Sequence, residues 1–393
     1  MTRPMRAGVN AIFLEPGMGG LETYVLELVP ALLRTDRSLR LTVLCNSRGR
    51  ELLARQPWAG EVQLVTPRAT ARGLRALFEL GPLGVLAGRR FDLLHSPALT
   101  APLATRAANV VVLADTTWIT VPDLGKGQAA TVRLWQAVVP HVARRADRVV
   151  AISTASARDI ERLLRVPHER IDVIPLGYGT PPRAEPTREA SLRARLRLGE
   201  GPIVLNVAMK KLHKNQLRLV QAMPAIREAA PDARLVMPGA RTPYEEALRQ
   251  EAAALGLDDA VVFPGHVSDA DLEGLYAAAS AFAFPSLNEG FGLPLLEAMA
   301  RDVPVVTSRV SALPEVAGDA ALLVDPTSVE EIAQAVTRVL TDEGVRKRLV
   351  SVGRERPQAF TWERCAQGTR ESWERALADR RTRRGLKRIP LRR

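Results

Sequence analysis

Two carboxylates stand eight residues apart in PSLNEGFGLPLLEAMA, residues 285–300, with a glycine-containing turn between them. Glu289 precedes the turn at Gly292, and Glu297 lies in the apolar run that follows Pro294. Proline is tolerated in the first turn of a helix, so the pattern predicts a helix that begins here. Backbone N–H groups at a helix start lack partners within the helix and attract anions. The stretch is therefore typical of a site for an anion or a polyhydroxylated ligand.

A second polar cluster lies in LNVAMKKLHKNQ, residues 205–216, between a predicted strand and a predicted helix. It carries Lys210, Lys211, His213 and Lys214. A lysine in such a loop can neutralise a diphosphate as a point charge. Each of these residues taken singly is better explained as a solvated loop charge. What favours a ligand site is that this loop and the Glu289 turn both lie at strand ends of one predicted domain.

A glycine-rich turn follows the first apolar run, in FLEPGMGGLETYV, residues 13–25. Its glycines, Gly19 and Gly20 among them, permit close approach of the backbone to a ligand, although packing alone would also explain them. The spacing differs from G-x-G-x-x-G, and the next apolar run ends in Asn46 instead of an acidic residue. A dinucleotide cofactor is therefore disfavoured.

The composition indicates a two-domain protein. A chain of 393 residues with 46% hydrophobic content can form two separate cores. Its two cysteines lie far apart in the sequence, which predicts a reduced, cytoplasmic protein without disulfides or a cysteine-based metal site. No run approaches the roughly 18 to 20 apolar residues that span a bilayer. We expect the protein to be soluble or at most peripheral to a membrane.

The net charge of +12 is concentrated at the C-terminus. Residues 380–393 hold eight Arg or Lys and no acid, and subtracting these eight charges from +12 leaves +4. Nucleic acid is therefore not an expected partner. The tail is either a solvated end or a patch attracted to an anionic membrane surface. Residues 75–90, RALFELGPLGVLAGRR, add either a second membrane-docking segment or a core-facing helix and loop.

Short apolar runs alternate with amphipathic patterns of helical length along the whole chain. This alternation predicts an α/β protein of two doubly wound, Rossmann-like domains with parallel sheets facing a cleft. In such sheets ligands bind beyond the carboxyl ends of the strands. The predicted strands are 11–15, 41–45, 92–96, 110–115, 148–153 and 171–176, then 202–208, 233–239, 260–265, 281–286, 303–308 and 320–325.

A long segment of the second half resembles a known family. The run HVSDADLEGLYAAASAFAFPSLNEGFGLPLLEAMARDVPVVTS, followed by LPEVAGDAALLVDP, resembles the signature of the family-4 retaining glycosyltransferases of GT-B architecture, including their E-x7-E pair. The resemblance is strong over residues 200–340 and weaker through ISTASARDIERLL, IDVIPLGYG, FDLLHSP and GGLETYV. FTWERCAQ resembles the terminal helix that crosses back to the first domain.

The resemblance implies domain roles and boundaries. The expected parts are a Rossmann-like acceptor domain (1–178), a linker rich in Pro and Gly (179–200), a nucleotide-sugar donor domain (201–358), a crossover helix (359–379) and a basic tail (380–393).

The resemblance also implies an activity and its residues. The expected enzyme is a retaining, metal-independent hexosyltransferase that moves a hexose, with mannose as one candidate, from a GDP- or UDP-linked donor to a glycan or lipid-linked acceptor. No cofactor beyond this co-substrate is expected. Glu289 and Asp115 would act in catalysis, Lys214 would neutralise the diphosphate, and Glu297 would bind the ribose. The other implied residues are Gly290, Phe291, Gly292 and Leu293 on the donor, and Gly19, Gly20 and His95 on the acceptor side.

Three residues depart from the family pattern. Ala114 stands where a histidine is frequent, Met209 where an arginine is frequent, and Asp302 where glycine is usual. The first two favour an alternative, a catalytically inactive nucleotide-sugar binding protein. Consumption of a nucleotide sugar with any acceptor would exclude that alternative.

Overall fold

The fold consists of two compact units. Unit 1 comprises residues 1–177 and 361–393, and unit 2 comprises residues 178–360. The predicted return of the C-terminal helix to the first domain is therefore confirmed. The computed structural model describes residues 4–67, 75–120, 129–179 and 184–386.

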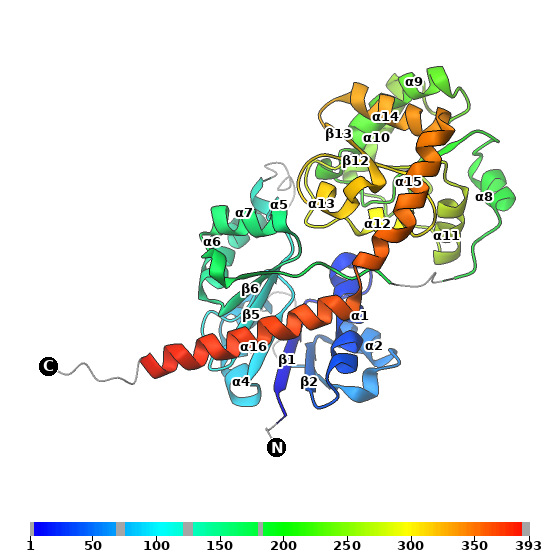
Figure 1. Cartoon of the computed structure of the whole chain (residues 1–393). Coiled ribbons are helices and arrows are strands. Elements are labelled where there is room, and N and C mark those ends of the chain that lie inside the picture. The colour runs from blue at the N-terminus through cyan, green and yellow to red at the C-terminus, as the bar shows by residue number, and fades with distance from the viewer. Residues whose placement is uncertain (1–3, 68–74, 121–128, 180–183, 387–393) are drawn as a thin grey trace. The chain divides into compact units, whose positions relative to one another are not determined.

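Unit 1 is built on a seven-stranded parallel sheet of order β3-β2-β1-β4-β5-β6-β7 (Figure 1). In β1, the third strand of this order, Val9 lies opposite Val43 of β2 on one side and His95 of β4 on the other. The strands are β1 (Arg6–Ala11), β2 (Arg40–Cys45), β3 (Gln63–Val65), β4 (Leu93–Ser96), β5 (Ala108–Leu113), β6 (Arg148–Ala151) and β7 (Ile171–Val173). The helices are α1 (Gly20–Thr35), α2 (Ser47–Ala54), α3 (Arg75–Leu80), α4 (Pro82–Arg90), α5 (Thr117–Thr120), α6 (Ala129–Arg145), α7 (Thr154–Leu164) and α16 (Trp362–Leu386).

The first predicted strand was misplaced. Residues 11–15 were expected to be extended, but β1 ends at Ala11 and the apolar residues after it are buried in the turn that follows. Asn10 made the true strand look polar, although it is fully buried and accepts a hydrogen bond from the Ile12 N–H at 3.4 Å. Strand β3 was not predicted.

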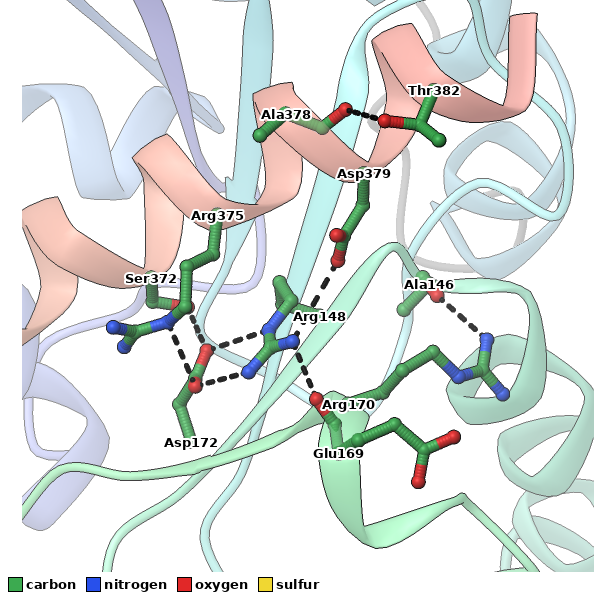
Figure 2. Close-up of polar contacts among 10 residues, drawn as sticks. All are labelled: Ala146, Arg148, Glu169, Arg170, Asp172, Ser372, Arg375, Ala378, Asp379 and Thr382. Carbon is green, nitrogen blue, oxygen red and sulfur yellow. Dashed lines mark hydrogen bonds and ion pairs between the residues drawn. The ribbon is translucent and has the colours of Figure 1, made fainter. Parts of the chain in front are cut away.

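Helix α16 is fixed to unit 1 by a buried network of charges (Figure 2). Asp172 of β7 is 7% exposed at its side chain and pairs with Arg148 of β6. It also accepts a hydrogen bond from Ser372 at 2.6 Å and pairs with Arg375 at 3.2 Å, both from α16. Asp379, one turn further on, lies 3.6 Å from Arg148. Charges that cannot reach water are thus balanced by partners on a distant segment of the chain.

The predicted start of the basic tail at residue 380 was wrong, because α16 continues to Leu386. Arg380 pairs with the buried Asp147 at 2.8 Å and donates to the Thr105 carbonyl. It therefore belongs to the folded unit. Residues 387–393 lie outside the described part of the chain.

Unit 2 is built on a six-stranded parallel sheet of order β10-β9-β8-β11-β12-β13. The two sheets with their helices confirm the predicted pair of α/β domains. The strands are β8 (Ile203–Leu205), β9 (Arg234–Val236), β10 (Val261–Val262), β11 (Ala281–Phe284), β12 (Val305–Ser308) and β13 (Ala321–Val324). The helices are α8 (Glu189–Leu196), α9 (Gln216–Ala229), α10 (Pro243–Ala254), α11 (Asp269–Ala278), α12 (Leu293–Met299), α13 (Leu313–Ala317), α14 (Val329–Thr341) and α15 (Glu343–Glu355).

Part of the predicted linker, residues 179–200, is folded. Residues 189–196 form α8, whose Leu192 is fully buried. A Cβ added to Gly274 of α11 would lie 2.6 Å from Leu192 Cδ1, so glycine allows the two helices to approach closely. The Thr187 hydroxyl donates to Asp271 at 2.7 Å. These contacts make the segment part of unit 2.

The helices of the described ranges include none that is both long and apolar enough to cross a membrane.

Candidate active site

The candidate site of unit 2 lies where the strand order reverses. Strands β8 and β11 are adjacent but not consecutive, and the chain leaves them in opposite directions across the sheet. Open α/β sheets bind ligands at this point, beyond the carboxyl ends of the strands. The loop after β8 carries Lys214 and the loop after β11 carries Glu289. The topology therefore brings together two polar segments that the sequence separates.

Lys214 and Glu289 form an ion pair in which Nζ and Oε1 are 2.6 Å apart. Their side chains are 19% and 12% exposed, so the pair is largely shielded from water. The Lys214 ammonium also lies 5.3 Å from the centroid of the buried Phe284 ring. This cation–π contact fixes its position further. A lysine and a carboxylate thus lie together in one partly buried place, and their predicted roles toward a diphosphate and a sugar stay predictions.

Asn215 holds the Lys214 loop in place. It is 2% exposed and has φ of 58°, a left-handed conformation in which asparagine is one of the more tolerated residues. Its Nδ2 donates to the carbonyls of Pro285 at 2.9 Å and Pro326 at 2.6 Å. One side chain therefore connects the ends of β8, β11 and β13.

Ser311, in the loop after the neighbouring strand β12, holds the Glu289 loop. Its Oγ accepts a hydrogen bond from the Glu289 backbone N–H at 3.0 Å. Ser311 has φ of 56°, which is costly for a residue with a side chain. Backbone strain of this kind persists where surrounding structure imposes it, and it is frequent at functional sites.

We expect Ser311→Ala to lower the sugar transfer that the sequence resemblance implies by about two- to tenfold, because the Glu289 N–H loses its partner. Ser311→Gly should lower transfer equally but give a more stable protein, because glycine relieves the left-handed strain. Asp302→Gly is the matched control, since Asp302 has φ of 59° and its carboxylate pairs with exposed Arg354. Kinetics and thermal unfolding distinguish the two effects. Full transfer by Ser311→Ala would contradict the proposed role.

The glycine turn between the glutamates is shaped by Gly292, whose φ is 114°. An added Cβ there would lie 2.8 Å from Leu313 Cδ2, and the left-handed backbone conformation favours glycine. Phe291 is buried against Phe360 at 5.4 Å between ring centroids, and Leu293 begins α12. The backbone from Gly290 to Leu293 therefore forms a fixed turn at the start of α12.

Glu297 lies on α12 and is not a freely solvated residue. It is half-buried, and its Oε2 accepts a hydrogen bond from the Tyr276 hydroxyl at 3.0 Å. Burial and the nearby Glu297 raise the pKa of Tyr276 well above 10, so its hydroxyl remains a donor. Assignment of Glu297 to the ribose stays a prediction.

The other basic residues of the β8 loop have different surroundings. Lys210 is 1% exposed, and its Nζ donates to the Gly239 carbonyl at 2.8 Å. Burial lowers the pKa of Lys210, opposed by Glu245 at 3.8 Å. His213 is buried, and burial with the adjacent lysines lowers its pKa to about 3. Met209 is 47% exposed. Lys210 therefore supports the loop and does not replace an arginine at position 209.

In unit 1, Gly19 and Gly20 lie at the start of α1, after strand β1. Gly19 has φ of 62°, and nothing lies within 4 Å of a Cβ built on either glycine. The Glu22 carboxylate accepts from the N–H groups of Gly17 at 2.7 Å and Met18 at 3.0 Å, which closes the loop. Asp115 follows β5 and accepts from the Thr117 N–H at 2.9 Å. Their predicted roles toward substrate stay predictions.

The predicted acceptor-side role of His95 was wrong. His95 is fully buried, and its Nδ1 accepts a hydrogen bond from Trp373 Nε1 at 3.2 Å. Its Nε2 lies 3.1 Å from the Tyr24 hydroxyl. Burial lowers the pKa of His95 to about 3, so the ring is neutral and Nε2 carries the proton. His95 joins α1 and α16 to the sheet and cannot contact a substrate.

Two family models match this chain over most of its length. The model described as glycosyl transferases group 1 matches residues 188–356, and that described as Glycosyltransferase Family 4 matches residues 18–180. The MMP alpha-(1->4)-mannosyltransferase of Mycolicibacterium hassiacum is 31% identical over 335 residues, which cover 77% of this chain and 75% of that one. The chain belongs to this family of glycosyltransferases.

Another relative, the O-antigen chain mannosyltransferase B of Escherichia coli, is 34% identical over 224 residues. The match covers 56% of this chain and spans 58% of the relative's length. Among solved structures, the Anabaena protein HepE in complex with UDP and glucose shares the fold with a TM-score of 0.73 at 22% identity. That match covers 94% of this chain and 99% of HepE.

Sucrose-phosphate synthase from Thermosynechococcus elongatus gives a TM-score of 0.72 at 21% identity, covering 95% of this chain and 99% of that one. At these identities the two structures show the fold alone. The predicted GT-B architecture is confirmed.

Sequence reasoning missed the residues that hold the predicted ones in place. Ser311 and Tyr276 carry no signal in a single sequence, because serine in a loop and tyrosine in an amphipathic helix are ordinary there. Asp302 was noticed as a departure from glycine, and its positive φ supplies the physical reason for the usual glycine.

Proposed function

We propose that this chain transfers a hexose, most simply mannose, from a nucleotide-diphosphate sugar to a glycan or lipid-linked acceptor. Membership of the glycosyltransferase family supports a sugar donor. The names of several relatives support mannose, and one of them is described as GDP-mannose-dependent. GDP is therefore the favoured base, with UDP as the second candidate.

The single observation that carries the proposal is the Lys214–Glu289 pair at the switch point of unit 2. A nucleotide diphosphate leaves with two phosphates whose negative charge grows as the glycosidic bond breaks. Lys214 is positioned to stabilise that charge without reorganisation. Glu289, held through its backbone by Ser311, accepts hydrogen bonds from the sugar hydroxyls. Donor binding displaces the direct contact of the two side chains: the diphosphate becomes the charge partner of Lys214, and the sugar hydroxyls become the hydrogen-bond donors to Glu289.

Transfer with retention of configuration and without a metal ion belongs to the same proposal. In this mechanism Lys214 and the backbone turn from Gly290 to Leu293 supply the charge stabilisation that a metal would otherwise provide. Activity in the presence of EDTA and the anomeric configuration of the product, read by NMR, test these two points.

A panel of nucleotide sugars tests the function directly. GDP-mannose should raise the unfolding temperature of the purified chain, because a ligand at 100 times its Kd stabilises by about 2.7 kcal/mol. GDP should then be released when glycan or lipid-linked acceptors are added. Stabilisation by a donor without release with any acceptor would favour the inactive binding protein. No stabilisation by any nucleotide sugar would overturn both functions.

The acceptor and location form the remaining part of the proposal. We place the protein in the cytoplasm, at the inner face of an anionic membrane, where lipid-linked acceptors are found. Leu77 and Val85 are 65% and 60% exposed, and Arg89 and Arg90 are exposed too, whereas Leu83 of the same segment is buried. Salt-sensitive sedimentation with anionic vesicles tests the contact with the membrane. For the truncated variant, residues 387–393 are removed, because this preserves the Arg380 contacts that a cut at 379 would destroy.

A further inference from the structure

The surroundings of Glu297 form a continuous polar chain that ends at Tyr178, the first residue of unit 2. Tyr276 donates to the Glu297 carboxylate at 3.0 Å. Arg301, one turn after Glu297, donates to the Glu297 carbonyl at 2.9 Å and to the Tyr178 hydroxyl at 3.2 Å. The Arg301 guanidinium also lies 4.8 Å from the centroid of the Tyr276 ring. Arg301 therefore contacts all three other members of the cluster, and Tyr178 is connected to it through Arg301.

The counter-charge of Arg301 is the carboxylate of Glu273 and not that of Glu297. Glu273 of α11 accepts two hydrogen bonds from Arg301, at 2.6 and 2.5 Å. This fork-like pairing fixes the guanidinium plane and is among the stronger polar contacts of proteins. The arginine thus bonds the backbone of Glu297 while Tyr276 orients its carboxylate. A carboxylate accepts at about four sites, so the Tyr276 bond is compatible with acceptance from ribose hydroxyls.

The other end of the polar chain is anchored where unit 2 begins and ends. The Tyr178 N–H donates to the carbonyl of Phe360, the last residue of unit 2, at 2.6 Å. The Phe360 ring packs edge-on against Phe291 of the glycine turn at 5.4 Å. The two termini of unit 2 therefore contact Arg301, which follows the helix that carries Glu297, and the turn that precedes that helix.

We propose that Tyr276, Arg301 and Tyr178 are positioning residues that set the geometry of Glu297 toward the ribose of the nucleotide. The inference rests on the proposed function, in which Glu297 binds the ribose hydroxyls. Arg301 holds the backbone of Glu297, Tyr276 holds the carboxylate, and Tyr178 ties Arg301 to the termini of unit 2. Loss of the Tyr178 hydroxyl then alters ribose recognition through Arg301.

The test compares binding of GDP with that of 2′,3′-dideoxy-GDP by calorimetry, with UDP and its dideoxy analogue instead if the donor panel selects UDP. The ratio of the two Kd values measures ribose hydroxyl recognition alone. We expect a ratio of about ten or more in the parent and about one in Glu297→Ala. Tyr276→Phe and Tyr178→Phe should each reduce the ratio to about three or less, and the double variant should do little more.

Tyr244→Phe is the control, because Tyr244 is a half-buried tyrosine of α10 outside this cluster. It should keep the parent ratio. Parent ratios in both Tyr276→Phe and Tyr178→Phe, with a ratio near one in Glu297→Ala, would overturn the inference and leave the proposed function intact. A parent ratio in Glu297→Ala would instead remove the ribose role itself. Thermal unfolding of each variant without nucleotide separates these outcomes from loss of fold.

Discussion

Asp172→Asn is expected to lower the free energy of unfolding of unit 1 by about 3–5 kcal/mol, the cost of breaking a buried ion pair from one side. The substitution keeps the shape of the side chain but leaves Arg148, 10% exposed, without its principal counter-charge. It also weakens the attachment of Arg375 and Ser372 on α16. Because the loss falls on one unit, it must be measured on that unit.

Tryptophan fluorescence makes this measurement selective. The chain has five tryptophans, and all of them, Trp58, Trp118, Trp135, Trp362 and Trp373, belong to unit 1. Denaturant unfolding followed by their emission therefore reports unit 1 separately from unit 2. Glu363→Gln is the matched control on α16, because its pair with Arg34 is 57% and 60% exposed and should contribute less than about 1 kcal/mol. Equal effects of the two substitutions would contradict the role of the buried network.

The effect of Asp172→Asn on the free energy of unfolding is expected to depend on pH. Burial acts to raise the pKa of Asp172, but hydrogen bonds from Arg148 and Ser372 outweigh burial and lower it from its ordinary value of 3.8. A carboxylate with a lowered folded-state pKa stabilises the protein above its unfolded-state pKa and loses that contribution as the pH falls through the folded-state value. The parent and Asp172→Asn should therefore differ fully at neutral pH and converge in acid.

Glu289→Gln should lower sugar transfer by about tenfold or more, equivalent to at least about 1.4 kcal/mol in the barrier. The amide has nearly the same size but lacks the charge and one acceptor oxygen.

Lys214→Ala should raise the Kd of the donor and slow transfer together, because it removes the cation next to the leaving diphosphate. Glu297→Ala should chiefly weaken nucleotide binding, since ribose contacts serve the ground and transition states alike.

Steady-state kinetics with the donor varied separate these effects. The exposed pair of Lys347 and Glu343 on α15 provides the control, with Nζ and Oε1 2.8 Å apart and side chains 75% and 65% exposed. Glu343→Gln and Lys347→Ala should leave both donor affinity and rate at parent values. Normal donor binding and turnover in Lys214→Ala would place the diphosphate elsewhere.

Local sequence patterns predicted the strands well where burial is continuous and poorly where polar residues are buried. Residues 281–286 and 303–308 contain β11 and β12, because parallel strands covered on both faces are apolar throughout. Strand β1 was misplaced because its polar residue Asn10 is buried. Helix α8 was not predicted because a Pro- and Gly-rich segment precedes it. The periodicity of apolar residues does not reveal that a polar residue is buried with a hydrogen-bond partner.

The candidate site was predicted in part for a similar reason. Glu289, Glu297 and Lys214 stand in recognisable stretches, and the topology brings Lys214 and Glu289 into contact. The hydrogen bond from Glu289 to Ser311 joins residues 22 positions apart and depends on the order of β11 and β12. His95 was misassigned because its partner, Trp373, lies 278 positions away. Contacts of this range follow from the folded sheet and leave no trace in local spacing.

The place of α16 in unit 1 has a consequence for how the chain is made. A ribosome synthesises the sheet of unit 1 first and its last helix only after all of unit 2. Until then His95 lacks Trp373, and Asp172 lacks Ser372 and Arg375. Unit 2, which is continuous in sequence, can complete its core while unit 1 still waits for its closing helix. Folding of the first-made unit is thus completed by a segment that is made only after the whole of unit 2.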